Sequence, residues 1–96
     1  MLKTLTFVIY AENHPDLLAR TVLLLHRLVI PIVGLVMQRP EHSARMRMTL
    51  DVLAPRDHSE RIAENLAKIV HVDWVESRKE LDRPKRAVRA SLLRSS

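Results

Sequence analysis

The spacing of apolar residues is the feature that most constrains the fold, because it switches repeatedly between the period of a strand and that of a helix. Near the N-terminus apolar and polar residues alternate, then apolar residues recur every three or four positions, and then they form a short run. After the polar segment "RPEHS" come a second alternating run, a second helical spacing and a last alternating run. We therefore predict strands at 2–11, 30–39, 45–52 and 70–76, and helices at 16–29 and around 62–69.

Each helix carries an apolar face that predicts where the core lies. The second helix has Ile62, Leu66 and Ile69 on one side. The first presents a stripe of Leu18, Val22, Leu25 and Val29, widened by Leu17, Thr21, Leu24 and Leu28. In the second predicted strand, Gly34 indicates a bulge or a close approach of the backbone.

Two β-α-β halves joined by a hairpin favour an α+β, ferredoxin-like βαββαβ fold. We expect a four-stranded antiparallel sheet with both helices on one face and the other face open. A domain of this size buries a smaller fraction of its surface on folding than a larger domain does, so its stability is expected to depend on a partner. We therefore also expect a homodimer. The predicted domain covers residues 1–76.

The basic charge lies in one part of the chain. Residues 1–76 hold nine Lys or Arg and nine Asp or Glu, so the formal charge of +5 comes from residues 77–96, with seven basic and two acidic residues. We predict a flexible basic tail there, more typical of a solubilising extension than of a nucleic-acid contact. An RNA-binding sheet needs aromatic residues on its central strands, and the chain has three aromatics in all. A nucleic-acid partner is therefore not expected.

Several classes of function are disfavoured by composition. The chain has no cysteine, which excludes a disulfide framework and a thiolate zinc site and suits the cytoplasm. Its five histidines are far apart in sequence, so we predict no metal site, and no pattern indicates catalytic residues. The first residues do not have the pattern of a signal peptide, and the apolar stretch 28–37 is too short to span a membrane.

Four short motifs resemble one family. They are "EN" at Glu12 and Asn13, Leu18-x-Arg20, "RMTL" at 47–50 and "L-x-K-I-V-x-V" at 66–72. With them, residues 6–76 resemble the ACT domain of the regulatory small subunit of acetolactate synthase.

The resemblance implies a non-catalytic homodimer that activates the catalytic large subunit in the biosynthesis of valine, leucine and isoleucine. This chain would hold no cofactor, since thiamine diphosphate, magnesium and FAD would belong to the catalytic partner. Two alternatives stay open: an amino-acid-binding ACT dimer that regulates another partner, and a nucleic-acid-binding module with a basic tail.

The resemblance also implies an effector site for a branched-chain amino acid at the turn between the first strand and the first helix. Feedback-sensitive members have Gly at the position of Asp16, Asn at that of Pro31 and commonly Gly at that of Val29. We expect Asp16 to cap the helix and to repel the carboxylate of a ligand, leaving the site degraded or retuned. The predicted effector-binding residues are Asn13, His14, Asp16, Leu17, Pro31 and Ile32.

The third predicted strand offers a candidate contact surface for a partner. Arg45, Arg47 and Thr49 alternate with the apolar residues and so face away from the core. Two cations on an open sheet face are suited to contact a partner protein, although a solvated strand face has the same pattern.

Overall fold

The computed structural model describes residues 1–40 and 43–78, together with the backbone of residues 84–89. Each predicted helix and strand is present, with shifted ends. The elements are β1 (Leu2–Glu12), α1 (Asp16–Arg27), β2 (Ile32–Gln38), β3 (Arg45–Pro55), a short 3₁₀ helix (Arg56–His58), α2 (Ser59–Ala67), β4 (Val72–Arg78) and β5 (Pro84–Arg89).

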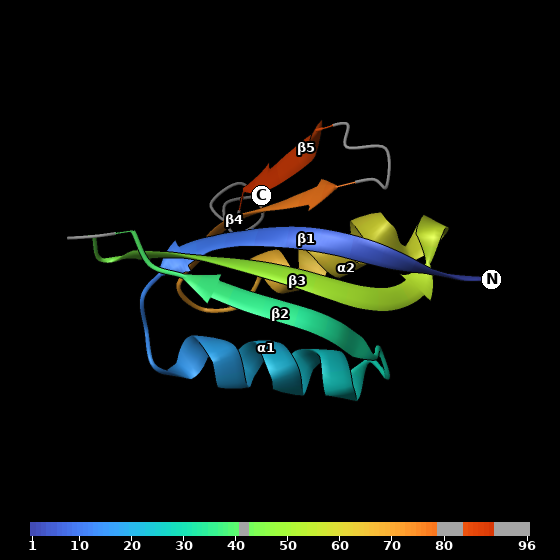
Figure 1. Cartoon of the computed structure of the whole chain (residues 1–96), viewed down its shortest axis with the longest axis horizontal. Helices are drawn as coiled ribbons and strands as arrows, with labels where there is room; N and C mark the ends of the chain where they lie inside the picture. Colours follow the sequence, from blue (N-terminus) through green and yellow to red (C-terminus); the bar gives the residue numbers. More distant parts are fainter. Residues whose placement is uncertain (41–42, 79–83, 90–96) are drawn as a thin grey trace.

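The strands form one antiparallel sheet in the order β2-β3-β1-β4-β5, with β1 in the centre (Figure 1). The first four strands have the predicted ferredoxin-like order. The fifth strand was not predicted: it pairs with β4 and lies within the region expected to be a tail. The predicted domain boundary after residue 76 falls inside β4, which continues to Arg78. The predicted flexibility of the tail concerns mainly residues 79–83 and 90–96, which lie outside the described residues.

The core lies on the side of the sheet that both helices cover. Phe7 and Ile9 of β1 are fully buried there, next to Leu50 of β3 and Val75 of β4 in register. Leu25 of α1 and residues of α2 complete the same apolar cluster. Side chains at alternate positions of the strands face the opposite side, which no described helix covers, as predicted for an open sheet face.

The buried face of α1 differs from the predicted stripe. Leu17, Thr21 and Leu25 are the buried residues, whereas Leu18 and Val22 are each 39% exposed. Thr21 is accepted in the core because its hydroxyl donates a hydrogen bond to the carbonyl of Leu17, at 2.8 Å. The core face is therefore shifted toward the residues that were expected to widen the stripe, and its centre lies about 70° from the centre of the stripe itself.

The chain after α1 also departs from the predicted core. Val29, placed in the stripe, is 85% exposed and has a left-handed φ of 58°, so it lies beyond the end of the helix. At Gly34 the expected irregularity is present, because the β2–β3 register shifts between Ile32 and Gly34. A Cβ at Gly34 would stand 3.2 Å from Oδ2 of Asp51, whose Oδ1 accepts a 2.6 Å hydrogen bond from Thr6. Glycine thus leaves room for this carboxylate.

Candidate functional site

The turn between β1 and α1 is fixed by backbone hydrogen bonds to two other segments. The amide of Glu12 donates to the carbonyl of His71, at 2.9 Å, and the amide of Asn13 donates to that of Ala44, at 2.7 Å. These bonds tie the turn to the segments that precede β4 and β3. The N-terminus of α1 therefore has a defined position at one end of the sheet.

His14 makes the contacts that begin α1. Its Nδ1 accepts a 3.1 Å hydrogen bond from the amide of Asp16, and its carbonyl accepts one of 3.1 Å from the amide of Leu17. Two amides of the first helical turn are thus already engaged by this chain.

The prediction that Asp16 caps the helix is wrong. Pro15 holds the N-cap position of α1, and its side chain makes no capping hydrogen bond. Asp16 is the first helical residue, and its Oδ2 lies 3.8 Å from Nη2 of Arg20, one turn further on. The carboxylate still lies in the positive field of the helix N-terminus, but at its side.

A second histidine supports His14, and no pattern in the sequence indicated it. The rings of His14 and His71 stack with their centroids 3.9 Å apart and their planes at 14°. Nδ1 of His71 is 3.0 Å from Oε1 of Glu12. His71 has a positive φ of 77°, which turns the chain into β4. Its place in the alternating run predicted an ordinary strand residue, so only the fold reveals this contact.

The structure brings together only part of the predicted effector site. Asn13, His14, Asp16 and Leu17 share the turn, with the Leu17 side chain buried in the core. Pro31 and Ile32 lie at the other end of α1, where β2 begins, about 18 Å away for a helix of this length. In Figure 1 the two groups lie at opposite ends of the sheet. One chain alone does not bring the six residues into one site.

The predicted partner-binding residues lie on the open face of β3, as expected. Nη1 of Arg45 is 2.5 Å from Oδ2 of Asp73, and the guanidinium of Arg47 donates two hydrogen bonds to Oε1 of Gln38, at 2.7 and 3.1 Å. Thr49 is half-buried in the same row of positions. Arg47 is therefore held by the neighbouring strand β2 and Arg45 by β4, on the far side of β1, and the Arg45 side chain remains 61% exposed.

An aromatic pair extends this face. Tyr10 lies between Arg47 and Trp74 in register, and the Tyr10 and Trp74 rings stack at 4.6 Å. A cavity of about 400 Å³ opens beside Tyr10 and Arg47 and is also lined by Arg39. The face thus combines an aromatic pair with cations, next to the carboxylates of Asp51, Asp73 and Glu76.

Two further structural observations concern only the residues described above. No group of three or more His, Asp or Glu side chains in this part of the chain is arranged to hold a metal ion. Among the same residues, no helix is both long and apolar enough to cross a membrane.

No protein-family model matches the chain, and no curated protein matches it. Solved structures do. The ACT domain of GTP pyrophosphokinase from Chlorobium tepidum superposes with a TM-score of 0.67 and 14% identity, over 80% of this chain and 99% of that domain. The C-terminal domain of MgtC from Mycobacterium tuberculosis gives 0.65 and 16%, over 85% and 93%.

A third similar structure is the regulatory subunit of aspartate kinase from Thermus thermophilus in its ligand-free form. It gives a TM-score of 0.56 and 15% identity over 80% of this chain, which spans 57% of that subunit. One of these three structures is named as an ACT domain and another as a regulatory subunit. The chain therefore has the ferredoxin-like fold of ACT domains.

Proposed function

We propose that this chain is a non-catalytic ACT-type regulatory subunit that works as a homodimer on acetolactate synthase in the cytoplasm. The fold supports an ACT-type module, and the motifs "RMTL" and "L-x-K-I-V-x-V" support this particular enzyme. Thiamine diphosphate, magnesium and FAD belong, in this proposal, to the catalytic partner. A branched-chain amino acid is the proposed effector.

The observation that carries the proposal is the position of the β1–α1 turn relative to the β2 edge. β2 is an outer strand whose last residue, Gln38, lies at the same end of the sheet as the turn. If two copies pair their β2 strands antiparallel about a twofold axis, Ile32 of the second copy lies across from Gln38. Pro31 and Ile32 of one copy then approach Asn13 of the other, which one chain alone does not achieve.

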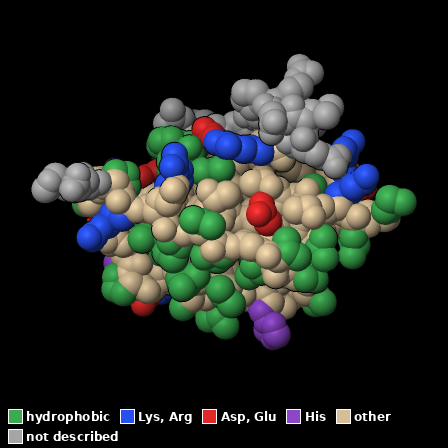
Figure 2. Space-filling view, in the orientation of Figure 1, with side chains coloured by type: hydrophobic (Ala, Val, Ile, Leu, Met, Phe, Trp, Pro, Cys, Tyr) green, Lys and Arg blue, Asp and Glu red, His purple; other side chains and the backbone are tan. Residues whose placement is uncertain are grey.

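The surface around β2 is suited to this pairing. Val33 and Val36 of β2 are 54% and 56% exposed. Figure 2 shows apolar side chains gathered over the region where Figure 1 places α1 and β2. The other outer strand, β5, has the sequence "PKRAVR", whose three cations disfavour pairing with a second copy. In this proposal the dimer forms through β2.

The effector site, in this proposal, binds its ligand weakly. A ligand carboxylate at the N-terminus of α1 has to displace Nδ1 of His14 from the Asp16 amide and to approach the Asp16 carboxylate. Asp16→Gly removes that charge, and Pro31→Asn restores a side-chain amide from the second copy. Calorimetry with valine, leucine and isoleucine tests this: the double variant should bind more tightly than the wild type, and a further Asn13→Ala change should abolish the gain.

The regulatory role is tested by assay of the catalytic large subunit with and without this chain. We expect co-purification of the two and at least a severalfold rise in acetolactate formation. The open face is the proposed contact, so Arg45→Gln with Arg47→Gln should reduce activation without preventing folding. Arg61→Gln, an exposed arginine of α2 on the helical side of the sheet, is the matched control. Full activation by the double variant would show that another surface makes the contact.

Regulation of another partner remains the alternative if the catalytic subunit neither binds nor responds. A role in nucleic-acid binding has less support, because the open face mixes its cations with the carboxylates of Asp51, Asp73 and Glu76. A gel shift that weakens with salt would favour it.

A further inference from the structure

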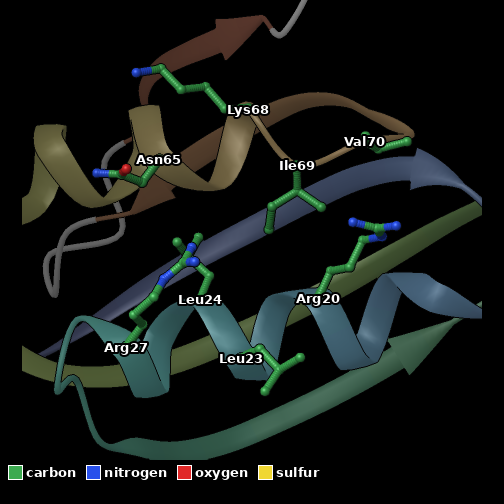
Figure 3. A pocket seen from close by; sticks show the side chains of 8 residues that line it. All are labelled: Arg20, Leu23, Leu24, Arg27, Asn65, Lys68, Ile69 and Val70. Carbon is green, nitrogen blue, oxygen red and sulfur yellow. The ribbon is translucent and has the colours of Figure 1, made fainter.

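A groove of about 440 Å³ lies between α1 and the C-terminal end of α2, on the helical side of the domain (Figure 3). On one side, Arg20, Leu24 and Arg27 project from α1 toward α2. On the other, Ile69 points toward α1, while Asn65 lies on the preceding turn of α2 and the Lys68 side chain extends away from α1. This groove is separate from the β1–α1 turn and from the open sheet face.

The charge of the groove has one sign. Its lining residues include three cations, Arg20, Arg27 and Lys68, and no carboxylate. Oδ2 of Asp16 lies 3.8 Å from Nη2 of Arg20, and the Arg20 side chain remains 52% exposed. Residues 1–76 are neutral as a whole, so this concentration of cations is local. Arg27 and Lys68 also lie at helix C-termini, where cations are favourable in any case.

The groove also has an apolar floor and rim. Leu24 and Ile69 form the floor, and Leu23 and Val70 are 64% and 49% exposed at the rim. On α1 the order is cation, leucine, cation at spacings of four and three, which covers about 10 Å along one side of the helix. A groove of this shape is complementary to a helix with the order acid, apolar, acid at the same spacing.

We propose that this groove binds an acidic, amphipathic helix of a partner protein. The chain's own segment 77–96 is an unsuitable occupant, because its seven basic and two acidic residues repeat the sign of the groove. A second copy is equally unsuitable: each chain carries +5, and facing helical surfaces would bring two cationic grooves together. The proposal needs no amino-acid effector, so it stands or fails independently of the β1–α1 turn.

The probe for this proposal is a synthetic peptide of about 18 residues, long enough to form a helix on binding. It carries Glu, Leu and Glu at spacings of four and three on an alanine background, with a fluorescent label. A matched peptide has Gln in place of each Glu. Titration with the full chain, followed by fluorescence anisotropy, should give saturable micromolar binding of the acidic peptide, about tenfold tighter than the neutral one and weakened by salt.

Variants of the protein then locate the site. Arg27→Gln and Lys68→Gln should each weaken binding about threefold, and together about tenfold. Arg39→Gln, an exposed arginine on the other side of the sheet, should change it less than twofold. Thermal unfolding shows whether the helix-end changes have damaged the fold. Amide shifts in NMR spectra should concentrate in α1 and residues 65–70.

Three results would overturn the proposal. The first is that the acidic peptide does not bind saturably. The second is that the acidic and neutral peptides bind equally well. The third is that Arg39→Gln and Arg27→Gln weaken peptide binding equally. Measurement without any amino acid keeps this outcome separate from that of the effector experiments.

Discussion

At the scale of single residues, the helix start shows how local sequence misleads. An acidic residue after proline at the beginning of a helical pattern indicates a cap, but Asp16 is already inside the helix and His14 makes the contact instead. His14 holds its position because its ring stacks on His71, a residue distant in sequence. A contact that depends on tertiary neighbours carries no signal in the local pattern.

The role of His14 gives a direct prediction. His14→Ala removes both the acceptor for the Asp16 amide and the stacked ring, so the free energy of unfolding should fall by about 1 kcal/mol, as for other lost caps. His14→Asn keeps an acceptor at nearly the same position and should lose about half as much. Urea denaturation measures both variants. Equal losses for the two would show that stacking, and not the hydrogen bond, is what matters.

Thr21 gives a second prediction at this scale. Its hydroxyl donates only to the Leu17 carbonyl, which also accepts the regular helical hydrogen bond, so Thr21→Val leaves no buried group without a partner. This change should alter the free energy of unfolding by less than about 0.5 kcal/mol. Thr21→Ser keeps the hydroxyl but deletes a buried methyl and should cost about 1 kcal/mol. The opposite ranking in urea denaturation would contradict this account of the core.

At the scale of elements, the βαββαβ order and the open sheet face follow from the sequence, because long periodic segments such as β1 and β3 carry a strong signal. The rotation of α1 did not follow, since Leu18 and Val22 are as apolar as the residues that are buried. β5 was missed for a different reason. "PKRAVR" has too few apolar residues to alternate, and a strand of this kind depends on the neighbour with which it pairs.

At the candidate site, too, the sequence indicated local features but not the contacts between distant segments. The sequence located the turn that carries Asn13 and His14, but the distance to Pro31 follows from the direction of α1 and β2. The groove between α1 and α2 combines residues of two helices and so has no local pattern. Arg45 and Arg47 were placed correctly on the open face, whereas their bonds to Asp73 and Gln38 depend on strand register.

The β2 edge carries the prediction for this scale. Val36→Lys places a charge on an exposed position of the proposed dimer interface, where it should raise the dissociation constant of the dimer at least about tenfold. The change should affect the fold little. Val70→Lys is the matched control, because Val70 is 49% exposed but lies in the groove between the helices. Sedimentation equilibrium decides: a monomeric wild type, or equal dissociation by both variants, would refute pairing through β2.

At the scale of the whole molecule, the two outer strands differ in what they expose. β2 is flanked by apolar side chains and is suited to pair with a second copy, while β5 separates β4 from solvent with a positively charged segment. The buried cluster, as far as the side chains are described, extends from Leu5 to Val75. The sequence of β5, with three cations among six residues, is suited to protecting an edge.

Removal of β5 tests whether this strand protects the edge of β4. A chain that ends at Arg78 keeps all of β4 and every residue of the described buried cluster, so it should still unfold cooperatively in a thermal scan. Its β4 edge becomes an unpaired edge strand, and light scattering should detect species larger than the dimer of the full chain. Ala87→Pro, which removes one backbone amide from β5 but keeps the basic segment, should cause the same association. If only the truncated chain associates, the positive charge of residues 79–96 is what prevents aggregation. If neither variant associates, the β4 edge stays monodisperse without a paired strand, and β5 is not needed to protect it.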